Sequence, residues 1–198
     1  MHFSDGSLNS VHVVAEFVYC PRSSYYLMTG AESAAVGTAG FREGAIMHGR
    51  VDAGGRRSLR GDEVTRSFRV VSTKLGLVGV IDQVKAGRGG DTEIWEYKRG
   101  KTRPSRIHEV QVALLALCYE ETAGRRPATG VVWTTGDRRA RRFPINRVLL
   151  DEAERAAYEF AVASHSASAA AWPRHRQAGC AGCVFRYLCW DERELAGL

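Results

Sequence analysis

The sequence lacks any apolar run as long as the roughly 18 residues that a membrane-spanning helix requires. Its first residues, Met1 to Gly6, also lack the basic start and apolar stretch that mark a secretory signal. We therefore expect an intracellular, cytoplasmic protein with no membrane association. Disulfides are disfavoured in that compartment, so the five cysteines indicate metal binding or catalysis.

Lysine is also scarce, since only four of the 28 basic residues are Lys: Lys74, Lys85, Lys98 and Lys101. Arginine supplies the rest of a positive balance that amounts to a net charge of +6, and Arg is the better clamp for phosphate groups. Such a surface favours polyanions such as nucleic acid, although a basic composition without function is the plain alternative. Where Arg is the default cation, the Lys of Glu96-x-Lys98 is the more informative residue.

The composition and the order of predicted elements indicate one α/β domain. The chain has 198 residues, 44% hydrophobic and 25% charged, which is typical of a single globular domain covering residues 1–198. The predicted helices cover residues 8–18, 22–28, 41–52, 106–122 and 147–171, and the predicted strands cover 67–72, 77–85, 92–98, 128–134 and 139–145. This order predicts a mixed sheet flanked by helices.

Two acidic residues and a lysine fall on adjacent predicted strands. Glu96 and Lys98 lie two residues apart, so they point to one face of a strand, about 6.6 Å from each other. Asp82 lies on the preceding strand within the apolar run Gly79-Val-Ile-Asp82-Gln-Val. A surface ladder of charges would explain the pattern, but a carboxylate among apolar residues is expected to be buried, and buried carboxylates are usually paired or metal-bound. Asp82 and Glu96 are therefore candidate metal ligands, and Lys98 is a candidate for orienting or deprotonating an attacking water.

Two further polar residues are weaker candidates. His48 belongs to the helix predicted over residues 41–52, where a lone His is more often a packing or hydrogen-bonding residue than a ligand. Gln111 lies beside Leu114 at the edge of an apolar helix face, where a buried and satisfied amide is the plain alternative.

Three cysteines close the chain as C-x2-C-x5-C, namely Cys180, Cys183 and Cys189, and Cys20 near the other end is a fourth candidate. Four thiolates are the ligand set of a structural zinc or of an iron-sulfur cluster, and the residues alone leave both open. Either would staple the two ends of the chain together. The fifth cysteine, Cys118, falls on the core side of its helix and is expected to pack rather than bind.

These motifs, in this order, resemble the CRISPR-associated RecB-type exonucleases, which are iron-sulfur nucleases of the PD-(D/E)xK superfamily. The shared set is Cys20-Pro21-Arg22-x-x-Tyr25, His48, Gly79-x-x-Asp82, Glu96-x-Lys98, Gln111 and the three terminal cysteines, so the resemblance covers nearly the whole chain. The chain departs from the family at Ile81, where the motif's name has Pro, and at Leu115, where a Tyr often follows the Gln.

The resemblance implies a restriction-endonuclease-like fold with a [4Fe-4S] cluster bound by the four cysteines. The cluster lobe would consist of residues 1–30 and 172–198 together.

For the nuclease site, the resemblance implies that His48, Asp82 and Glu96 bind Mn2+ or Mg2+ and that Gln111 faces the site. The implied activity is a DNA nuclease that trims or selects fragments, with single-stranded ends or overhangs, before their integration into a CRISPR array. The implied partner is the CRISPR integrase, to which members of this family also occur fused.

Two alternatives remain open beside this interpretation. One is an iron-sulfur nuclease of DNA repair, against which the small size and the lack of a helicase motif argue. The other is a non-catalytic DNA-binding adaptor of the same fold, against which the joint presence of Asp82, Glu96 and Lys98 argues.

Two basic segments are candidates for contacting DNA. The first is the loop after the Glu-x-Lys strand, with Arg99, Lys101 and Arg103, which a strand ending at the site delivers to its rim. The second is a Gly-rich segment with Arg56, Arg57 and Arg60, for which a solvated loop is an equal alternative.

Overall fold

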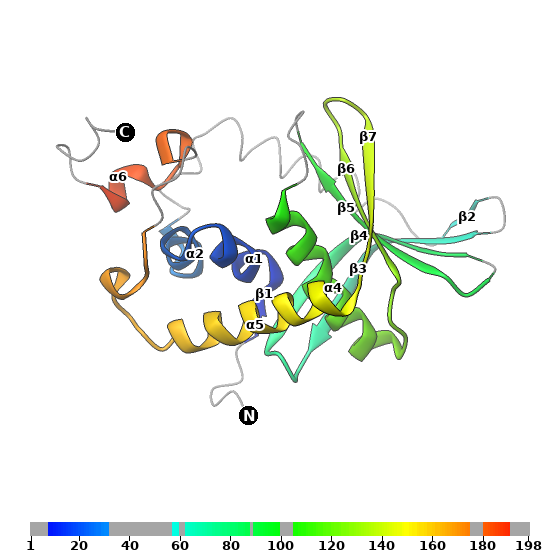
Figure 1. The fold of residues 1–198 in the computed structure, drawn as a ribbon, viewed down its shortest axis with the longest axis horizontal. Helices are drawn as coiled ribbons and strands as arrows, with labels where there is room; N and C mark the ends of the chain where they lie inside the picture. The colour runs from blue at the N-terminus through cyan, green and yellow to red at the C-terminus, as the bar shows by residue number, and fades with distance from the viewer. Residues whose placement is uncertain are drawn as a thin grey trace.

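A computed structural model describes residues 8–31, 57–59, 62–87, 89–99, 105–174 and 180–190 (Figure 1). The helices are α1 (Val11–Tyr19), α2 (Pro21–Met28), α4 (Arg106–Ala123), α5 (Arg147–Ala163) and α6 (Arg186–Cys189), with short 3-10 helices η2 (Ala169–Ala171) and η3 (Cys180–Gly182). The strands are β1 (Asn9–Ser10), β2 (Arg57–Leu59), β3 (Asp62–Ser72), β4 (Leu77–Ala86), β5 (Thr92–Lys98), β6 (Thr129–Thr134) and β7 (Arg139–Pro144). The helix predicted over residues 41–52 lies outside the described residues.

The strands form one mixed sheet in the order β2-β3-β4-β5-β6-β7, and β1 pairs with β4. The β3-β4, β4-β5 and β6-β7 pairs are antiparallel, whereas β5 and β6 are parallel. Figure 1 shows α1, α4 and α5 together on one side of this sheet. The predicted α/β class with a mixed sheet and flanking helices is confirmed.

Local sequence signals explain where the helices begin and end. The side chain of Ser10 caps α1 by accepting a hydrogen bond from the backbone N–H of His12. Pro21 occupies the first turn of α2, where its missing N–H costs nothing. The helix α4 begins after Ser105, and Gly124 ends it in the left-handed conformation with φ 71°.

The core lies between the sheet and α4, and α5 packs over α4 and α1. Because α4 is enclosed between these layers, every residue from Glu109 to Ala116 is buried, polar ones included. The largest fully buried side chains include Leu114, Leu115, Ile94 and Phe160. Within the described residues, no helix is both long enough and apolar enough to cross a bilayer.

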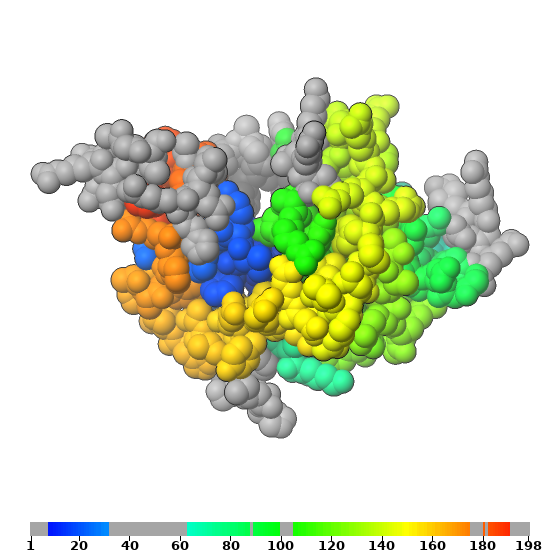
Figure 2. Space-filling model, viewed as in Figure 1, coloured from blue at the N-terminus to red at the C-terminus, as the bar shows by residue number. Residues whose placement is uncertain are grey.

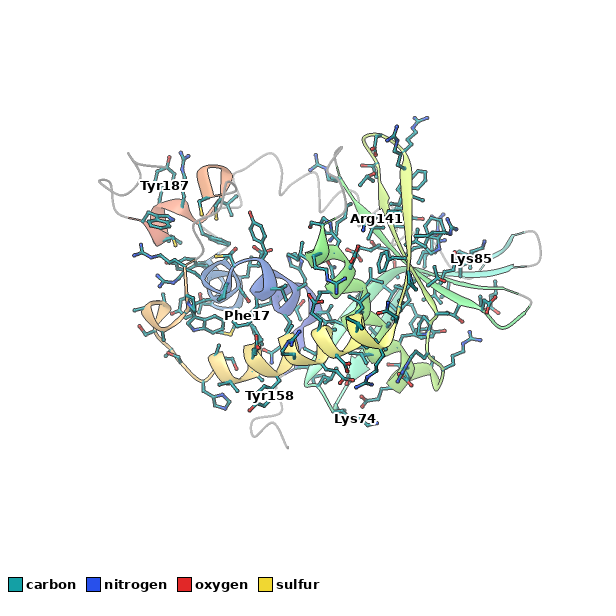
Figure 3. The ribbon with its side chains drawn as sticks, in the orientation of Figure 1. Phe17, Lys74, Lys85, Arg141, Tyr158 and Tyr187 are labelled. Atoms are coloured by element: carbon teal, nitrogen blue, oxygen red, sulfur yellow. The ribbon has the colours of Figure 1, made fainter. Side chains whose placement is uncertain are left out.

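The last long helix is shorter than predicted, because α5 ends at Ala163 and not at residue 171. The chain turns after Ser164 so that Trp172 reaches the core, where it is fully buried. Its ring lies 5.8 Å from the rings of both Phe17 and Phe160, with centroids as the reference points. In Figure 3, Phe17 lies between α1 and α5. The burial of one indole therefore overrides the helix propensity of an Ala-rich run.

The two ends of the described chain lie side by side, as Figure 2 shows for the blue α1-α2 surface and the orange segment after α5. Arg22 Nε donates to the Trp172 carbonyl at 2.8 Å, and the Tyr26 hydroxyl donates to the Leu188 carbonyl at 2.5 Å. The Tyr26 and Phe185 rings pack with centroids 5.4 Å apart. Protein contacts therefore join α2 to the C-terminal segment.

Candidate functional site

The sheet opens beside Asp82 because β4 changes its neighbour there. The first part of β4 pairs with β1 through Ser10 and Val78, and its last part pairs with β5 from Gln83 onward. Between these ladders, the Asp82 carboxylate accepts a hydrogen bond from the backbone N–H of Tyr97, with Oδ2 2.7 Å from the nitrogen. In a regular ladder, the Tyr97 N–H would bond to a backbone carbonyl of β4. Here it bonds to a side-chain oxygen instead, so the backbone pairing of β4 and β5 ends at this point.

The partner strand β3 is irregular at the same level. The ladder pairs Arg66 with Gln83 and Phe68 with Ile81, and between them Ser67 has a φ of 52° in the left-handed region. Alternation along β4 fails here too, since Ile81 and Asp82 are both buried, with exposed fractions of 0% and 4%. The predicted burial of Asp82 is confirmed. Val80, two residues earlier, is 45% exposed and lines the same cavity as Asp82.

Glu96, Lys98 and Gln111 form a closed set of polar contacts. Lys98 Nζ lies 2.8 Å from Glu96 Oε1 and donates to Gln111 Oε1 at 2.8 Å. Gln111 Nε2 donates to Glu96 Oε1 at 2.9 Å. Glu96 and Lys98 therefore do share one face of β5, and the amide from α4 satisfies the buried carboxylate and positions the ammonium.

One cavity of about 640 Å³ brings Asp82, Glu96, Lys98 and Gln111 together. The remaining lining residues are Ser10, Val11, His12, Ser67, Arg69, Gly79, Val80 and Leu115. Its floor holds the buried carboxylates, and Arg69 and Val80 are exposed at its mouth. Four residues from two strands and one helix, distant in the sequence, thus face one space.

Comparison with known proteins identifies this arrangement. The family model of the PD-(D/E)XK nuclease superfamily matches residues 14–190. The chain belongs to the PD-(D/E)XK nuclease superfamily. The match includes both strands of the site, the helix with Gln111 and the cysteines at both ends.

One known protein and one solved structure are similar to this chain. The chain is 35% identical over 105 residues to a "CRISPR-associated exonuclease Cas4/endonuclease Cas1 fusion" of Geobacter sulfurreducens, which supports the resemblance to the CRISPR-associated RecB-type nucleases. The match covers 50% of this chain and 18% of that protein. The crystal structure of SSO0001 covers 95% of this chain and 88% of its own, with a TM-score of 0.52 and 16% identity, and so supports the fold alone.

Enzymes of the PD-(D/E)XK superfamily typically use divalent metals, and the donors in the large cavity fit such an ion. Asp82 and Glu96 offer carboxylate oxygens, the ligands that Mg2+ and Mn2+ prefer. Within the described residues, no three His, Cys, Asp or Glu side chains gather closely enough to bind an ion. The third expected ligand, His48, lies outside the described residues.

Cys20 and the three cysteines of the C-x2-C-x5-C motif line a second, smaller cavity between α2 and the C-terminal segment. Burial, followed by the neighbouring Cys20 thiol, raises the pKa of both Cys183 and Cys189. The four thiols share this cavity, but within the part of the chain that the structure describes they do not gather closely enough to bind a metal ion.

The fifth cysteine differs in kind. Cys118 is fully buried on α4, and burial raises the pKa of its thiol to about 12. A protonated thiol in the apolar core is a packing residue, as the sequence predicts.

Three further residues of the site were not predicted from the sequence. His108 accepts a hydrogen bond from the Ser105 N–H at Nδ1, 3.1 Å away, and burial lowers its pKa to about 4, with Lys98 adding to the effect. The Ser105-x-x-His108 spacing of a capping box was the available signal.

Glu16 on α1 accepts a hydrogen bond from the Ser23 hydroxyl at 2.8 Å, and burial raises the pKa of Glu16 whereas Lys98 lowers it. Arg69 had no local signal at all.

The predicted DNA-binding residues are only partly described. Arg99 directly follows β5 and is half-buried. Arg57 begins β2, whereas Arg56, Arg60, Lys101 and Arg103 lie outside the described residues. All six stay predictions.

Proposed function

We propose that this chain is a divalent-metal-dependent DNA nuclease that trims or selects DNA fragments before their integration into a CRISPR array. The observation that carries the proposal is the meeting of Asp82, Glu96 and Lys98 around one cavity in a PD-(D/E)XK fold. The CRISPR role and an integrase partner are supported by the Cas4/Cas1 fusion relative. An iron-sulfur nuclease of DNA repair and a non-catalytic adaptor are the alternatives that the experiments below distinguish.

Each residue has a distinct task in phosphodiester hydrolysis. Asp82 and Glu96, with His48, would hold Mn2+ or Mg2+, which supplies a polarised phosphate and an acidified water when bound. Lys98 orients the attacking water or offsets the negative charge that develops at phosphorus. Its ammonium is held by two partners at 2.8 Å, so little reorganisation is needed when the reaction begins. Gln111 fixes Lys98 and Glu96 relative to each other.

The nuclease activity is tested with substitutions on the two strands. Asp82→Ala, Glu96→Ala and Lys98→Ala should each abolish cleavage of single-stranded DNA in Mn2+, and EDTA should do the same to the wild type, while DNA binding is largely kept. Glu93→Ala is the matched control, because Glu93 lies on the same strand and pairs with Arg142 outside the cavity. Full activity of Asp82→Ala would show that the cavity is not the active site, and binding without any cleavage by the wild type would favour the adaptor.

The cysteine cavity is proposed to hold a [4Fe-4S] cluster that joins residues 1–30 and 172–198 into one lobe. The support is the shared cavity of four cysteines and the family resemblance. Iron and sulfide contents of anaerobically purified protein, with its visible absorption, distinguish the cluster from zinc.

The integrase partnership has its own test. Co-elution of this chain with the CRISPR integrase in gel filtration, dependent on a DNA fragment with single-stranded ends, is the expected result. Processing of such fragments without any association would favour the DNA-repair role.

A further inference from the structure

We propose that Arg69 forms a phosphate-binding subsite at the mouth of the catalytic cavity, holding the DNA strand beside the scissile linkage. This inference rests on the proposed nuclease function, because it takes the large cavity as the place where DNA is cut. The ligand is a backbone phosphodiester, recognised by charge and geometry and not by base identity.

The position of Arg69 in the sheet provides the first argument. Arg69 on β3 is paired with Val80 on β4, and Val80 precedes Asp82 by two residues on the same strand. Two residues of a strand span about 6.6 Å and neighbouring strands lie about 4.8 Å apart, so Arg69 starts close to the cleavage centre. Its side chain lines the same cavity as Asp82, Glu96 and Lys98. A long Arg side chain in this place reaches a phosphate one or two nucleotides from the scissile one.

The charge environment of Arg69 provides the second argument. Some exposed arginines of the sheet are neutralised by carboxylates, such as Arg142 by Glu93 at 3.3 Å and Arg141 by Glu109 at 2.7 Å. Arg69 is exposed, and no carboxylate among the described residues pairs with it. The carboxylates of the cavity are engaged elsewhere, Asp82 by the Tyr97 N–H and Glu96 by Lys98 and Gln111. With respect to the described residues, the guanidinium therefore keeps its donors for a ligand, and a phosphate takes two of them at once.

The surface beside Arg69 suits a nucleic-acid strand. Val80, at 45% exposure, supplies an apolar patch next to the guanidinium on the same cavity wall. His12, at the start of α1, is also exposed and lines the same cavity as Arg69. A charged group flanked by an apolar surface matches the phosphate and sugar of one nucleotide.

The test measures DNA affinity by fluorescence anisotropy in an Asp82→Asn background, where no cleavage disturbs the equilibrium. The probes are single-stranded oligonucleotides in which one linkage at a time is a neutral methylphosphonate. Arg69→Gln should weaken binding of the unmodified strand roughly tenfold, and it should reduce the slope of log affinity against log salt by about one. Arg69→Lys should recover part of the affinity, since it keeps the charge and loses the bidentate geometry.

Arg155→Gln is the matched control, because Arg155 is exposed on α5 and lines neither cavity. The decisive result is coupling: one methylphosphonate position should weaken binding by the Arg69 protein and not weaken it further in Arg69→Gln. Unchanged affinity of Arg69→Gln, an equal loss in Arg155→Gln, or a loss with no coupled linkage would each overturn the subsite. Coupling together with an inactive wild type in Mn2+ would keep the subsite and overturn the nuclease proposal.

Discussion

Gln111 and His108 show how single side chains of α4 set the state of the site. Gln111 donates to Glu96 and accepts from Lys98, so one amide satisfies both charged residues in a buried place. His108 is one turn earlier on the helix and stays neutral at ordinary pH, because burial and the Lys98 charge lower its pKa to about 4. The neutral His108 ring therefore adds no second positive charge beside Lys98.

Removing the amide should impair catalysis more than binding. Gln111→Ala leaves the Lys98-Glu96 pair without its bridge, so we expect the cleavage rate at saturating DNA to fall roughly tenfold or more while KM changes little. Gln83→Ala is the matched control, because Gln83 bonds the Tyr97 hydroxyl outside the cavity. Single-turnover cleavage in Mn2+ measures both, and equal rates for the two variants would remove Gln111 from the catalytic geometry.

His108 should make the protein less stable in mild acid. The folded state takes up the proton near pH 4 and the unfolded state near 6.5, so between these values the unfolded state binds more protons. The contribution to stability is fully present above pH 6.5 and is lost as the pH falls toward 4. His108→Gln keeps an acceptor for the Ser105 N–H and cannot titrate. Urea unfolding at pH 7 and pH 5 should show a smaller loss for His108→Gln than for the wild type; an equal loss would contradict the assignment.

At the level of elements, α4 can position Gln111 only because it lies close to the sheet. A Cβ atom at Gly130 on β6 would lie 2.8 Å from Val112 Cγ1 and 2.6 Å from the Phe143 ring. A Cβ atom at Gly79 on β4 would lie 2.7 Å from Leu115 Cδ2. Two strand glycines thus allow the helix to approach two strands on either side of the site.

Gly130→Ala should therefore affect both stability and activity. We expect a loss of about 1–3 kcal/mol of unfolding free energy from overpacking, and slower cleavage because Val112 adjoins Gln111. Gly89→Ala is the control, since a Cβ atom there meets nothing within 4 Å. Thermal unfolding and single-turnover cleavage report the two effects, and a Gly130→Ala protein as stable as Gly89→Ala would show that α4 has room to move.

At the level of the whole molecule, the helix pair α1-α2 connects the two cavities. Ser10 and His12 line the large cavity, whereas Cys20 and Arg22 line the cysteine cavity. Trp172 and the Arg22 bond to its carbonyl dock the C-terminal segment onto this pair. We therefore expect that disrupting the cysteine cavity also disturbs the geometry of the nuclease site, because the helix pair α1-α2 contributes to both.

Substitution of Cys20, Cys180, Cys183 or Cys189 by Ser should remove iron and solubility together, because the free energy of cluster binding is also folding free energy. Cys118→Ala is the control and should keep its iron with only a packing loss, since its thiol lies in the core. Iron and sulfide analysis of anaerobic preparations gives the answer. Stoichiometric zinc without iron in the wild type would replace the cluster with a structural zinc site.

Local periodicity and capping chemistry determined much of this protein from sequence alone. The two-residue period of a strand put Glu96 and Lys98 on one face, and the helices predicted over residues 8–18 and 22–28 overlap α1 and α2. The apolar run around Asp82 predicted its burial correctly. These features depend on residues a few positions apart, so the chain itself contains the information.

Contacts between distant segments decided the rest. Only the pairing of β1 and β5 with different parts of β4 opens the sheet at Asp82, and only the β3-β4 register puts Arg69 at the cavity. Likewise, α5 ends at Ala163 because Trp172 finds its partners on α1 and α5, and the low pKa of His108 comes from burial and from Lys98 on another element. Burial and pairing of this kind are properties of the packed molecule, which no local spacing encodes.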